Sequence, residues 1–322
     1  MTRIAASLAA ALFVLAGAAA HAQPYPSKPI KFLVPFAAGG PADTMARLTA
    51  QVLSEGVGQS IVIDNRPGAG GIIGARTAAA ADPDGYTLMY GNTASLVVGP
   101  AVYANPGYDP VKHFAPIALV AVSYNVLVLN PAFPANSVPE LIAYAKKNPG
   151  KVNFASPGHG TPPHMVGELF KQRAEIDIVH VPYKGTAAAL TDIMGGQVEL
   201  TFENPSVVVP LVQTGKLKAL GVTGETRNPQ IPDVPTMVES GLSDFVSMSF
   251  TGLVAPAGTP AAIIKQLSNA LQKGLASAEV RATMDKLGVI PRPGTPDDFG
   301  TFLAREAEKW QTVAKRAHIR ID

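Results

Sequence analysis

Two histidines and one glutamate stand at spacings that could bind a metal ion. His159 and His164 are five residues apart, and Glu168 follows four residues later. On a helix, His164 and Glu168 would share one face, as ligands do in some zinc sites. His159 falls in a turn, however, and no third ligand pattern is evident. We therefore expect no metal, with His164 hydrogen-bonded locally and His159 lining a cleft.

Other reactive patterns are incomplete. The segment Gly68–Gly74 suggests a dinucleotide-binding turn, but the third glycine of G-x-G-x-x-G would fall at residue 73, which is Ile73. There is no G-x-S-x-G elbow and no P-loop, and the acids form no obvious acid/base pair. The chain has no cysteine, which excludes thiolate nucleophiles and disulfides. We expect no cofactor, no catalytic residue and no enzymatic activity.

Two segments share a different pattern. The apolar run 30–34 is followed by Pro35–Asp43, and the run 152–155 is followed by Ser156–His164. Each reads as a short strand, a glycine-rich turn and a proline that starts a helix. Such turns let backbone amides approach a guest, and a helix start adds partial positive charge. One such turn in each half predicts a cleft that holds an anion from both sides.

The N-terminus has the features of an export signal. Arg3 precedes the apolar run 4–20, and Ala20-His21-Ala22 is an Ala-x-Ala cleavage signal. We expect cleavage before Gln23 and a periplasmic protein; an uncleaved membrane anchor is the alternative. The formal net charge is +2 without a basic run, which gives nucleic-acid binding little support. The rest of the chain is long enough for two cores of about 150 residues each.

Strands and helices alternate twice along the chain. In the first half, strands are expected near 30–34, 61–64 and 86–90, with helices near 41–55 and 70–81. In the second half, strands are expected near 152–155, 177–181, 198–202 and 217–222, with helices near 137–147, 163–173, 186–195 and 205–214. Helices are also expected over 260–275, 277–288 and from 295 onward, the last with Trp310 packed in the core. This order predicts α/β lobes with mainly parallel sheets.

Two long apolar runs could join the lobes. The run 114–129 is too long for one ordinary strand, and a second run covers 246–256. Two crossings would return the C-terminal part to the first lobe and allow closure around a ligand. The expected division is a signal peptide over 1–22, lobe 1 over 23–123 and 247–322, and lobe 2 over 124–246.

An ordered set of short motifs covers nearly the whole mature chain. The motifs are Tyr25–Ile30, Val34–Gly40, Asn65–Gly71, Pro83–Leu88, Tyr108–Pro110, His180–Thr186, Gly195–Val198 and Ala255–Pro260. In this order and spacing the chain resembles the Bug-type extracytoplasmic receptors of tripartite tricarboxylate transporters. The resemblance implies a two-lobed periplasmic-binding-protein fold of type II, a small carboxylate ligand (often a dicarboxylate), and delivery to membrane permease subunits. It also implies that backbone amides and bridging waters hold the carboxylate.

The resemblance, together with the turns at strand ends, indicates the ligand-facing positions. Two departures from the family pattern are Glu203, where Asp is common, and His159, at a variable position. Asp43 is expected mainly to order its turn. The candidate ligand-binding residues are Phe36, Ala38, Gly39, Gly40, Asp43, Asn92, Thr93, Ala94, Ser156, His159, Gly160, Thr161, Tyr183, Lys184, Gly185, Glu203 and Asn204.

The expected mechanism is capture by closure. One carboxylate would bind the Phe36–Gly40 turn, and the Ser156–Thr161 turn would meet the ligand from lobe 2. We expect a monomer. The alternatives are a sensing receptor that docks on a sensor kinase and an exported α/β enzyme. Amino diacids, citrate-like triacids, aromatic diacids and nicotinate-like monoacids all remain open as ligands.

Overall fold

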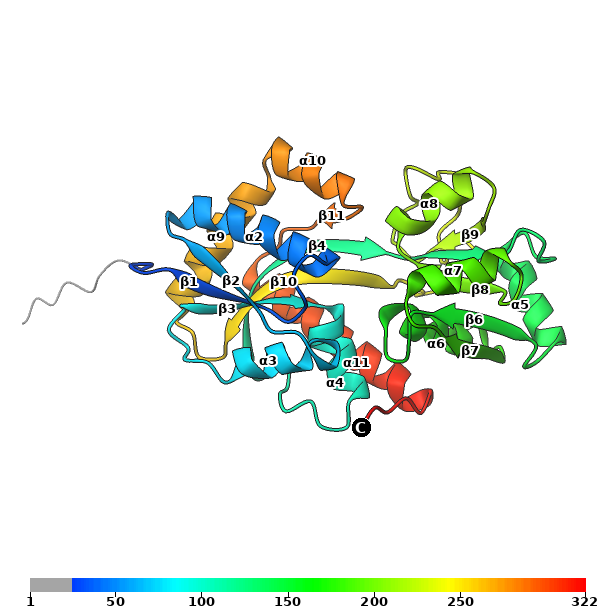
Figure 1. Cartoon of the computed structure of the whole chain (residues 1–322), viewed down its shortest axis with the longest axis horizontal. Helices are drawn as coiled ribbons and strands as arrows, with labels where there is room; N and C mark the ends of the chain where they lie inside the picture. Colours follow the sequence, from blue (N-terminus) through cyan, green and yellow to red (C-terminus); the bar gives the residue numbers. More distant parts are fainter. Residues whose placement is uncertain (1–24) are drawn as a thin grey trace, which may run out of the picture.

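The computed structural model describes residues 25–322, and the expected signal peptide lies outside that range. Two lobes are visible, each with its own sheet flanked by helices (Figure 1). We define lobe 1 by the six-stranded sheet β11-β4-β10-β3-β1-β2, and lobe 2 by the five-stranded sheet β7-β6-β8-β5-β9. No helix in the described range is both long and apolar enough to cross a membrane. The predicted two-lobed α/β class is confirmed.

The elements follow the chain in a simple order. Lobe 1 begins with β1 (Ile30–Val34), α2 (Pro41–Val57), β2 (Ile61–Asn65), η1 (Ala69–Gly71), α3 (Ile72–Ala79), β3 (Thr87–Asn92), η2 (Ala94–Val98), α4 (Gly99–Val102) and β4 (Phe114–Tyr124). Lobe 2 contains β5 (Val126–Leu129), α5 (Val138–Lys147), β6 (Val152–Ser156), α6 (Pro162–Ala174), β7 (Ile178–Pro182), α7 (Thr186–Met194), β8 (Leu200–Glu203), α8 (Pro205–Gln213) and β9 (Lys218–Val222). Lobe 1 resumes with β10 (Met248–Pro256), α9 (Ala261–Leu275), α10 (Ala278–Lys286), β11 (Ile290–Pro291) and α11 (Pro296–Arg316).

The helix expected over 70–81 is shorter than predicted. Gly70 and Gly71 have φ angles of 63° and 99°, in the left-handed region. A right-handed helix cannot pass through that backbone conformation, so α3 begins only at Ile72. The helical turns η2 and α4 after β3 were not predicted, because Ala94–Val102 is almost entirely apolar and reads equally well as a strand.

The prediction of mainly parallel sheets is wrong, because both sheets are mixed. In lobe 1, β1 pairs in parallel with β2 and β3, while β10 and β4 run antiparallel to their neighbours. In lobe 2, β6 pairs in parallel with β7 and β8, whereas β5 is antiparallel to β8 and β9. Strands β5 and β10 enter from the other lobe without a crossover helix and pair antiparallel with their neighbours, since only parallel pairing requires such a helix.

Three buried residues lie at the two crossings between the lobes. Asn125 separates β4 from β5, and its N–H donates to Thr223 Oγ1 at 2.9 Å. The Thr223 hydroxyl donates to the Ser247 carbonyl at 2.6 Å, just before β10 begins. The run 114–129 therefore enters both sheets, as predicted. The second run enters only lobe 1, because β10 lies entirely in that sheet.

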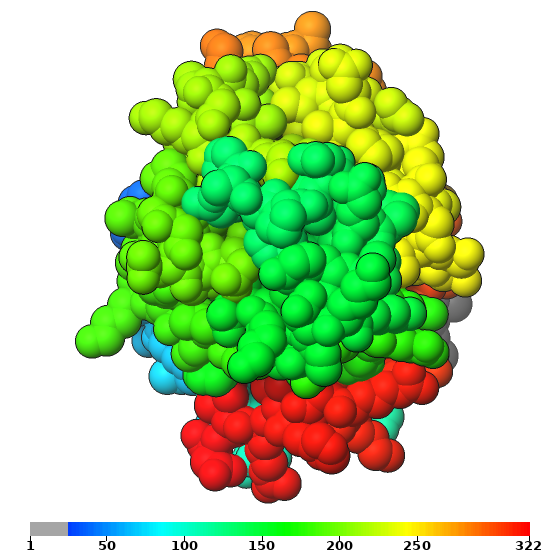
Figure 2. All heavy atoms as spheres, turned by 90° about the vertical axis from the view of Figure 1, so that its right-hand side faces the viewer, coloured from blue at the N-terminus to red at the C-terminus, as the bar shows by residue number. Residues whose placement is uncertain are grey.

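The lobes also touch beside the crossings. Helix α11 reaches lobe 2, where the Gln172 side-chain amide donates to the Val313 carbonyl at 3.1 Å. The view from the lobe 2 end shows this C-terminal segment, in red, directly beneath lobe 2 (Figure 2). Trp310 on α11 is 1% exposed, as expected for a packing residue. On the opposite side, Gly288 lies so close to Ser206 that an added Cβ would come within 3.0 Å of the serine Cβ.

Candidate functional site

A cleft of about 800 Å³ lies between the lobes. Its walls come from the ends of strands and the starts of helices in both lobes, and its floor comes from β4 and β10. Of the predicted residues, six line it: Gly39, Asn92, Thr93, Ala94, Glu203 and Asn204. These positions follow the rule that ligands of α/β sheets bind beyond the carboxyl ends of the strands.

Four α-helices begin at the cleft. Residues that line it include Ala42 of α2, Pro162 of α6, Thr186 of α7 and Ser206 of α8. Each helix directly follows a strand: β1 in lobe 1, and in lobe 2 the mutually parallel strands β6, β7 and β8. The positive ends of four helix dipoles therefore face one space, which favours a negatively charged guest.

Three of these helix starts, those of α2, α6 and α7, have no side-chain cap. The N-cap residues of α2 and α7 are Gly40 and Gly185, and neither offers a side chain to the first-turn amides. Helix α6 begins with two prolines, which carry no amide hydrogen, and Asn204 caps α8 by accepting from the Ser206 N–H. Among the helices whose starts do not line the cleft, α5, α10 and α11 have side-chain caps, whereas α3, α4 and α9 do not. One start in each lobe thus presents amides without a side-chain partner to the cleft.

The lobe 1 turn is organised by Asp43. Its carboxylate accepts from the Gly39 N–H at 2.9 Å, from Arg47 Nε at 2.8 Å and from Asn65 Nδ2 at 2.9 Å. The hydrogen bond from Arg47, followed by the one from Gly39, lowers the pKa of Asp43 to about 2. Asn65 also donates to the Phe36 carbonyl at 3.0 Å, which ties the turn to the end of β2. Asp43 therefore orders the turn, as expected, and does not line the cleft.

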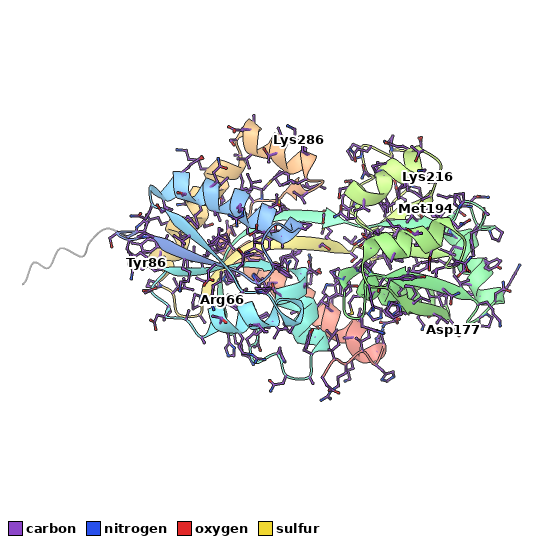
Figure 3. The ribbon with its side chains drawn as sticks, viewed as in Figure 1. Arg66, Tyr86, Asp177, Met194, Lys216 and Lys286 are labelled. Atoms are coloured by element: carbon purple, nitrogen blue, oxygen red, sulfur yellow. The ribbon has the colours of Figure 1, made fainter. Side chains whose placement is uncertain are left out.

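Other predicted residues of this turn also lie outside the cleft lining. The Phe36 ring packs against Gly71, where an added Cβ would come within 3.2 Å of it. Ala38 and Gly40 flank the lining residue Gly39 without joining it. The Arg66 side chain, whose direction the sequence did not indicate, pairs with Asp64 at 2.9 Å (Figure 3).

The Ser156–Thr161 turn of lobe 2 does not line the cleft. Two of its amides are bonded to nearby side chains: the Gly158 N–H donates to Ser156 Oγ at 3.2 Å, and the Gly160 N–H donates to His164 Nδ1 at 3.0 Å. The Thr161 hydroxyl donates to the Gly158 carbonyl at 2.7 Å. A Cβ at Gly160 would meet lobe 1 side chains of α4 and the C-terminal segment. This turn supports the start of α6. No residue of the turn lines the cleft, and the nearest residue that does is Pro162, the first of α6.

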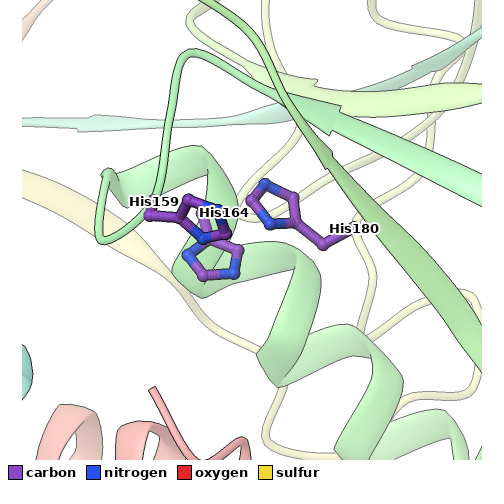
Figure 4. Close-up of side chains that lie close together, drawn as sticks. All are labelled: His159, His164 and His180. Carbon is purple, nitrogen blue, oxygen red and sulfur yellow. The ribbon is translucent and has the colours of Figure 1, made fainter. Parts of the chain in front are cut away.

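His180 joins the two histidines singled out in the sequence (Figure 4). One ring nitrogen of each lies within 4.8 Å of the others, while the rings of His164 and His180 stack with centroids 3.7 Å apart. His180 Nε2 is 2.6 Å from Ser156 Oγ. Burial, and then the neighbouring imidazoles, lower the pKa of His164 to about 4 and that of His180 to about 3.

The histidine cluster supports the turn rather than presenting a metal site. Because His164 Nδ1 accepts from the Gly160 N–H, its neutral ring carries the proton on Nε2 and has no lone pair left for a metal. His164 is thus bonded locally, as predicted, but His159 is exposed and does not line the cleft. Sequence spacing missed His180. It lies opposite Phe154 in the parallel pairing of β6 and β7, so a correct strand register would have found it.

Of the remaining predicted residues of lobe 2, some line the cleft and others do not. The Tyr183 hydroxyl donates to Asp192 at 2.8 Å, Lys184 is exposed, and none of the segment Tyr183–Gly185 lines the cleft. Glu203 and Asn204 do line it. Residues that the sequence did not indicate also line it, among them Tyr90, Ser123, Thr186, Ser249, Phe250, Thr251 and Lys286. Several of these lie on the crossing strands β4 and β10, which form the floor.

Only two charged residues in the described chain line the cleft, one from each lobe. Lys286 is exposed at the end of α10, on lobe 1 (Figure 3). Glu203 ends β8 in lobe 2 and is 4% exposed. Burial raises the pKa of Glu203 above its ordinary value, although the Asn204 N–H and the Thr186 hydroxyl donate to its carboxylate.

Two α/β lobes joined by crossing strands, with a cleft at the strand ends, define the class of periplasmic binding proteins. Residues 45–319 match the tripartite tricarboxylate transporter family receptor. The chain is 37% identical to Protein BugT of Bordetella pertussis over 98% of its own length and 97% of the relative. This chain belongs to the tripartite tricarboxylate transporter receptor family, as the sequence motifs predicted.

Solved structures give the same result for the fold. A Rhodopseudomonas palustris protein solved with adipate aligns with a TM-score of 0.75 and 35% identity, over 92% of this chain and 99% of that one. MatC from Rhodopseudomonas palustris with bound malate aligns with a TM-score of 0.72 and 34% identity, over 90% and 99% of the two chains. Both neighbours were solved with small carboxylates.

Proposed function

We propose that this protein captures a small carboxylate in the interlobe cleft and delivers it to a tripartite tricarboxylate-type membrane permease. The observation that carries the proposal is the pair of uncapped helix starts, α2 from lobe 1 and α7 from lobe 2, at one cleft. No arginine lines the cleft in the part of the chain described. Backbone amides and helix dipoles therefore supply most of the attraction for the anion. The adipate and malate of the structural neighbours support a dicarboxylate.

The two-lobed arrangement supports recognition by closure. Lobe 1 (residues 23–123 and 247–322) and lobe 2 (residues 124–246) would move about the crossing at Asn125, Thr223 and Ser247. A guest that contacts both lobes binds the closed form preferentially, and the closed form is what the permease would recognise. Cleavage before Gln23 would place this receptor, acting without catalysis, in the periplasm.

A proline substitution can remove one backbone N–H donor from the cleft and leave the helix intact. Ala42 is the second residue of α2, where the N–H has no partner within the helix and proline is tolerated. In Ala42→Pro, the loss of one hydrogen bond to a charged group, about 1.5–3 kcal/mol, should weaken binding by about tenfold or more. Isothermal titration against a panel of mono-, di- and tricarboxylates provides the measurement.

The matched control is Ala262→Pro. Ala262 is also the second residue of a helix without a side-chain cap, α9, but it does not line the cleft. This variant should bind the best acid of the panel as the parent does. The proposal fails if no acid of the panel binds the parent, or if Ala42→Pro binds as tightly as Ala262→Pro.

A further inference from the structure

Glu203 is a buried acid at the cleft without a basic partner. Its Oε1 accepts from the Thr186 hydroxyl at 3.0 Å, and its Oε2 accepts from the Asn204 N–H at 3.2 Å. Within residues 25–322, no lysine, arginine or histidine forms an ion pair with it. A carboxylate has about four positions that accept hydrogen bonds, so about half of its capacity is unused.

An ionised group in such a place needs a compensating charge. Removing a carboxylate from water is expensive unless a cation or further donors replace the lost solvent. The starts of α7 and α8, which lie on either side of Glu203 through Thr186 and Asn204, favour its ionised form. The protein itself provides no counter-ion, yet the carboxylate lines the space that a guest would occupy.

The only basic side chain that lines the cleft in the described residues lies in the lobe opposite Glu203. Lobe 1 contributes Lys286 and the uncapped start of α2 at Ala42, whereas Glu203 belongs to lobe 2. A guest that spans the cleft therefore meets Lys286 and the start of α2 on the lobe 1 side, and on the lobe 2 side the Glu203 carboxylate between the starts of α7 and α8. A simple dicarboxylate would bring a second negative charge toward Glu203.

We propose that the guest carries an ammonium group together with its carboxylate, and that Glu203 binds the ammonium. The ligand class is thus an amino-substituted carboxylate, bound with its carboxylate at the start of α2 and its ammonium at Glu203. This inference rests on the proposed function, because it assigns the ligand of the same cleft. Glu203 is then the residue that makes the cleft prefer carboxylates with an ammonium group over carboxylates without one.

Matched ligand pairs test the proposal by isothermal titration. The pairs are succinate with L-aspartate and glutarate with L-glutamate, with L-malate as the hydroxyl analogue. In the parent, the ammonium-bearing member of at least one pair should bind at least tenfold more tightly than its unsubstituted partner. Glu203→Gln should abolish that preference and still bind the unsubstituted diacid, which shows that the cleft is folded. Glu175→Gln, which removes an exposed charge beyond the far end of α6, should keep the preference.

Three results would overturn the inference. The first is a parent that binds the unsubstituted diacid as tightly as the ammonium-bearing one in both pairs. The second is a preference that survives in Glu203→Gln. The third is L-malate that binds as tightly as L-aspartate. In that case a neutral hydroxyl group would satisfy Glu203 as well as an ammonium group does. In all three cases carboxylates still bind, so the proposed function stands; a parent that binds no carboxylate refutes the proposed function itself.

Discussion

Replacing Asp43 with asparagine should loosen the lobe 1 turn and destabilise the protein. All three partners of the Asp43 carboxylate are donors: the Gly39 N–H and Arg47 Nε on one oxygen, and Asn65 Nδ2 on the other. An asparagine side chain has one oxygen and one NH₂ group. In either orientation, its NH₂ group must face at least one of these donors.

The magnitude follows from the bonds that asparagine can keep. In its better orientation, Asp43→Asn keeps the bonds from Gly39 and Arg47 and loses the one from Asn65, which also holds the Phe36 carbonyl. Losing one hydrogen bond to a charged group, and the negative charge beside Arg47, should reduce the free energy of unfolding by about 2–3 kcal/mol. For a chain of this size, that corresponds to a decrease in Tm of roughly 3–5 °C.

The effect should depend on pH in a defined direction. The pKa of Asp43 is lowered from 3.8 to about 2, so its contribution to stability is complete above pH 3.8 and disappears as pH falls toward 2. Thermal unfolding followed by circular dichroism should show the full difference between parent and variant at pH 7. The difference should shrink when the melts are repeated at progressively lower pH.

Asp297→Asn is the matched control. Asp297 is exposed in the first turn of α11, so its substitution changes only the interaction with a helix dipole, about 0.3–1 kcal/mol. If Asp43→Asn lowers Tm no more than Asp297→Asn does at pH 7, the carboxylate does not organise the turn and the reasoning is wrong.

Three further substitutions test the cleft and the core. Glu203→Gln should raise the Tm of the ligand-free protein at pH 7, because burial raises the pKa of Glu203 and makes its ionisation unfavourable; the gain should vanish near pH 4, where the parent carboxyl is protonated in both states. Thr93→Val should lower stability by about 1–3 kcal/mol in urea unfolding, since the buried Phe250 N–H, 2.7 Å from Thr93 Oγ1, loses its acceptor. Gly167→Ala should cost about 1–3 kcal/mol, because the new Cβ would lie 2.2 Å from Phe154 Cε2.

Controls separate these effects from general damage. Thr93→Ser keeps the hydroxyl and should stay close to the parent, so equal losses in the serine and valine variants would contradict the hydrogen-bond argument. Gly195→Ala meets nothing closer than a backbone oxygen at 3.4 Å and should be tolerated, unlike Gly167→Ala. A Glu203→Gln variant with the parent's Tm at every pH would show that the buried carboxylate carries no penalty.

The sequence by itself determined the order of most elements and the class of protein, although η2, α4 and β11 were not predicted. Apolar runs followed by glycine, proline or asparagine mark the strand ends and helix starts, and these signals are local in the chain. The run 114–129 also showed one crossing, since it is too long for a single strand. The motif series indicated the family, which the match over residues 45–319 confirmed.

Only the tertiary structure decided which turns meet the cleft. Ser156–Thr161 has the composition of an anion-binding turn, but its Gly158 and Gly160 amides are bonded to Ser156 and His164, whereas the start of α7 is left uncapped. These partners are close in the chain, but distant residues hold the turn: Ser156 Oγ lies 2.6 Å from His180 Nε2, and a Cβ at Gly160 would meet Val102 and Ile321 of lobe 1. The floor on β4 and β10 and the isolation of Glu203 are likewise products of long-range packing. Local sequence patterns cannot report where a hydrogen-bond donor finds its partner when that partner is distant in the chain.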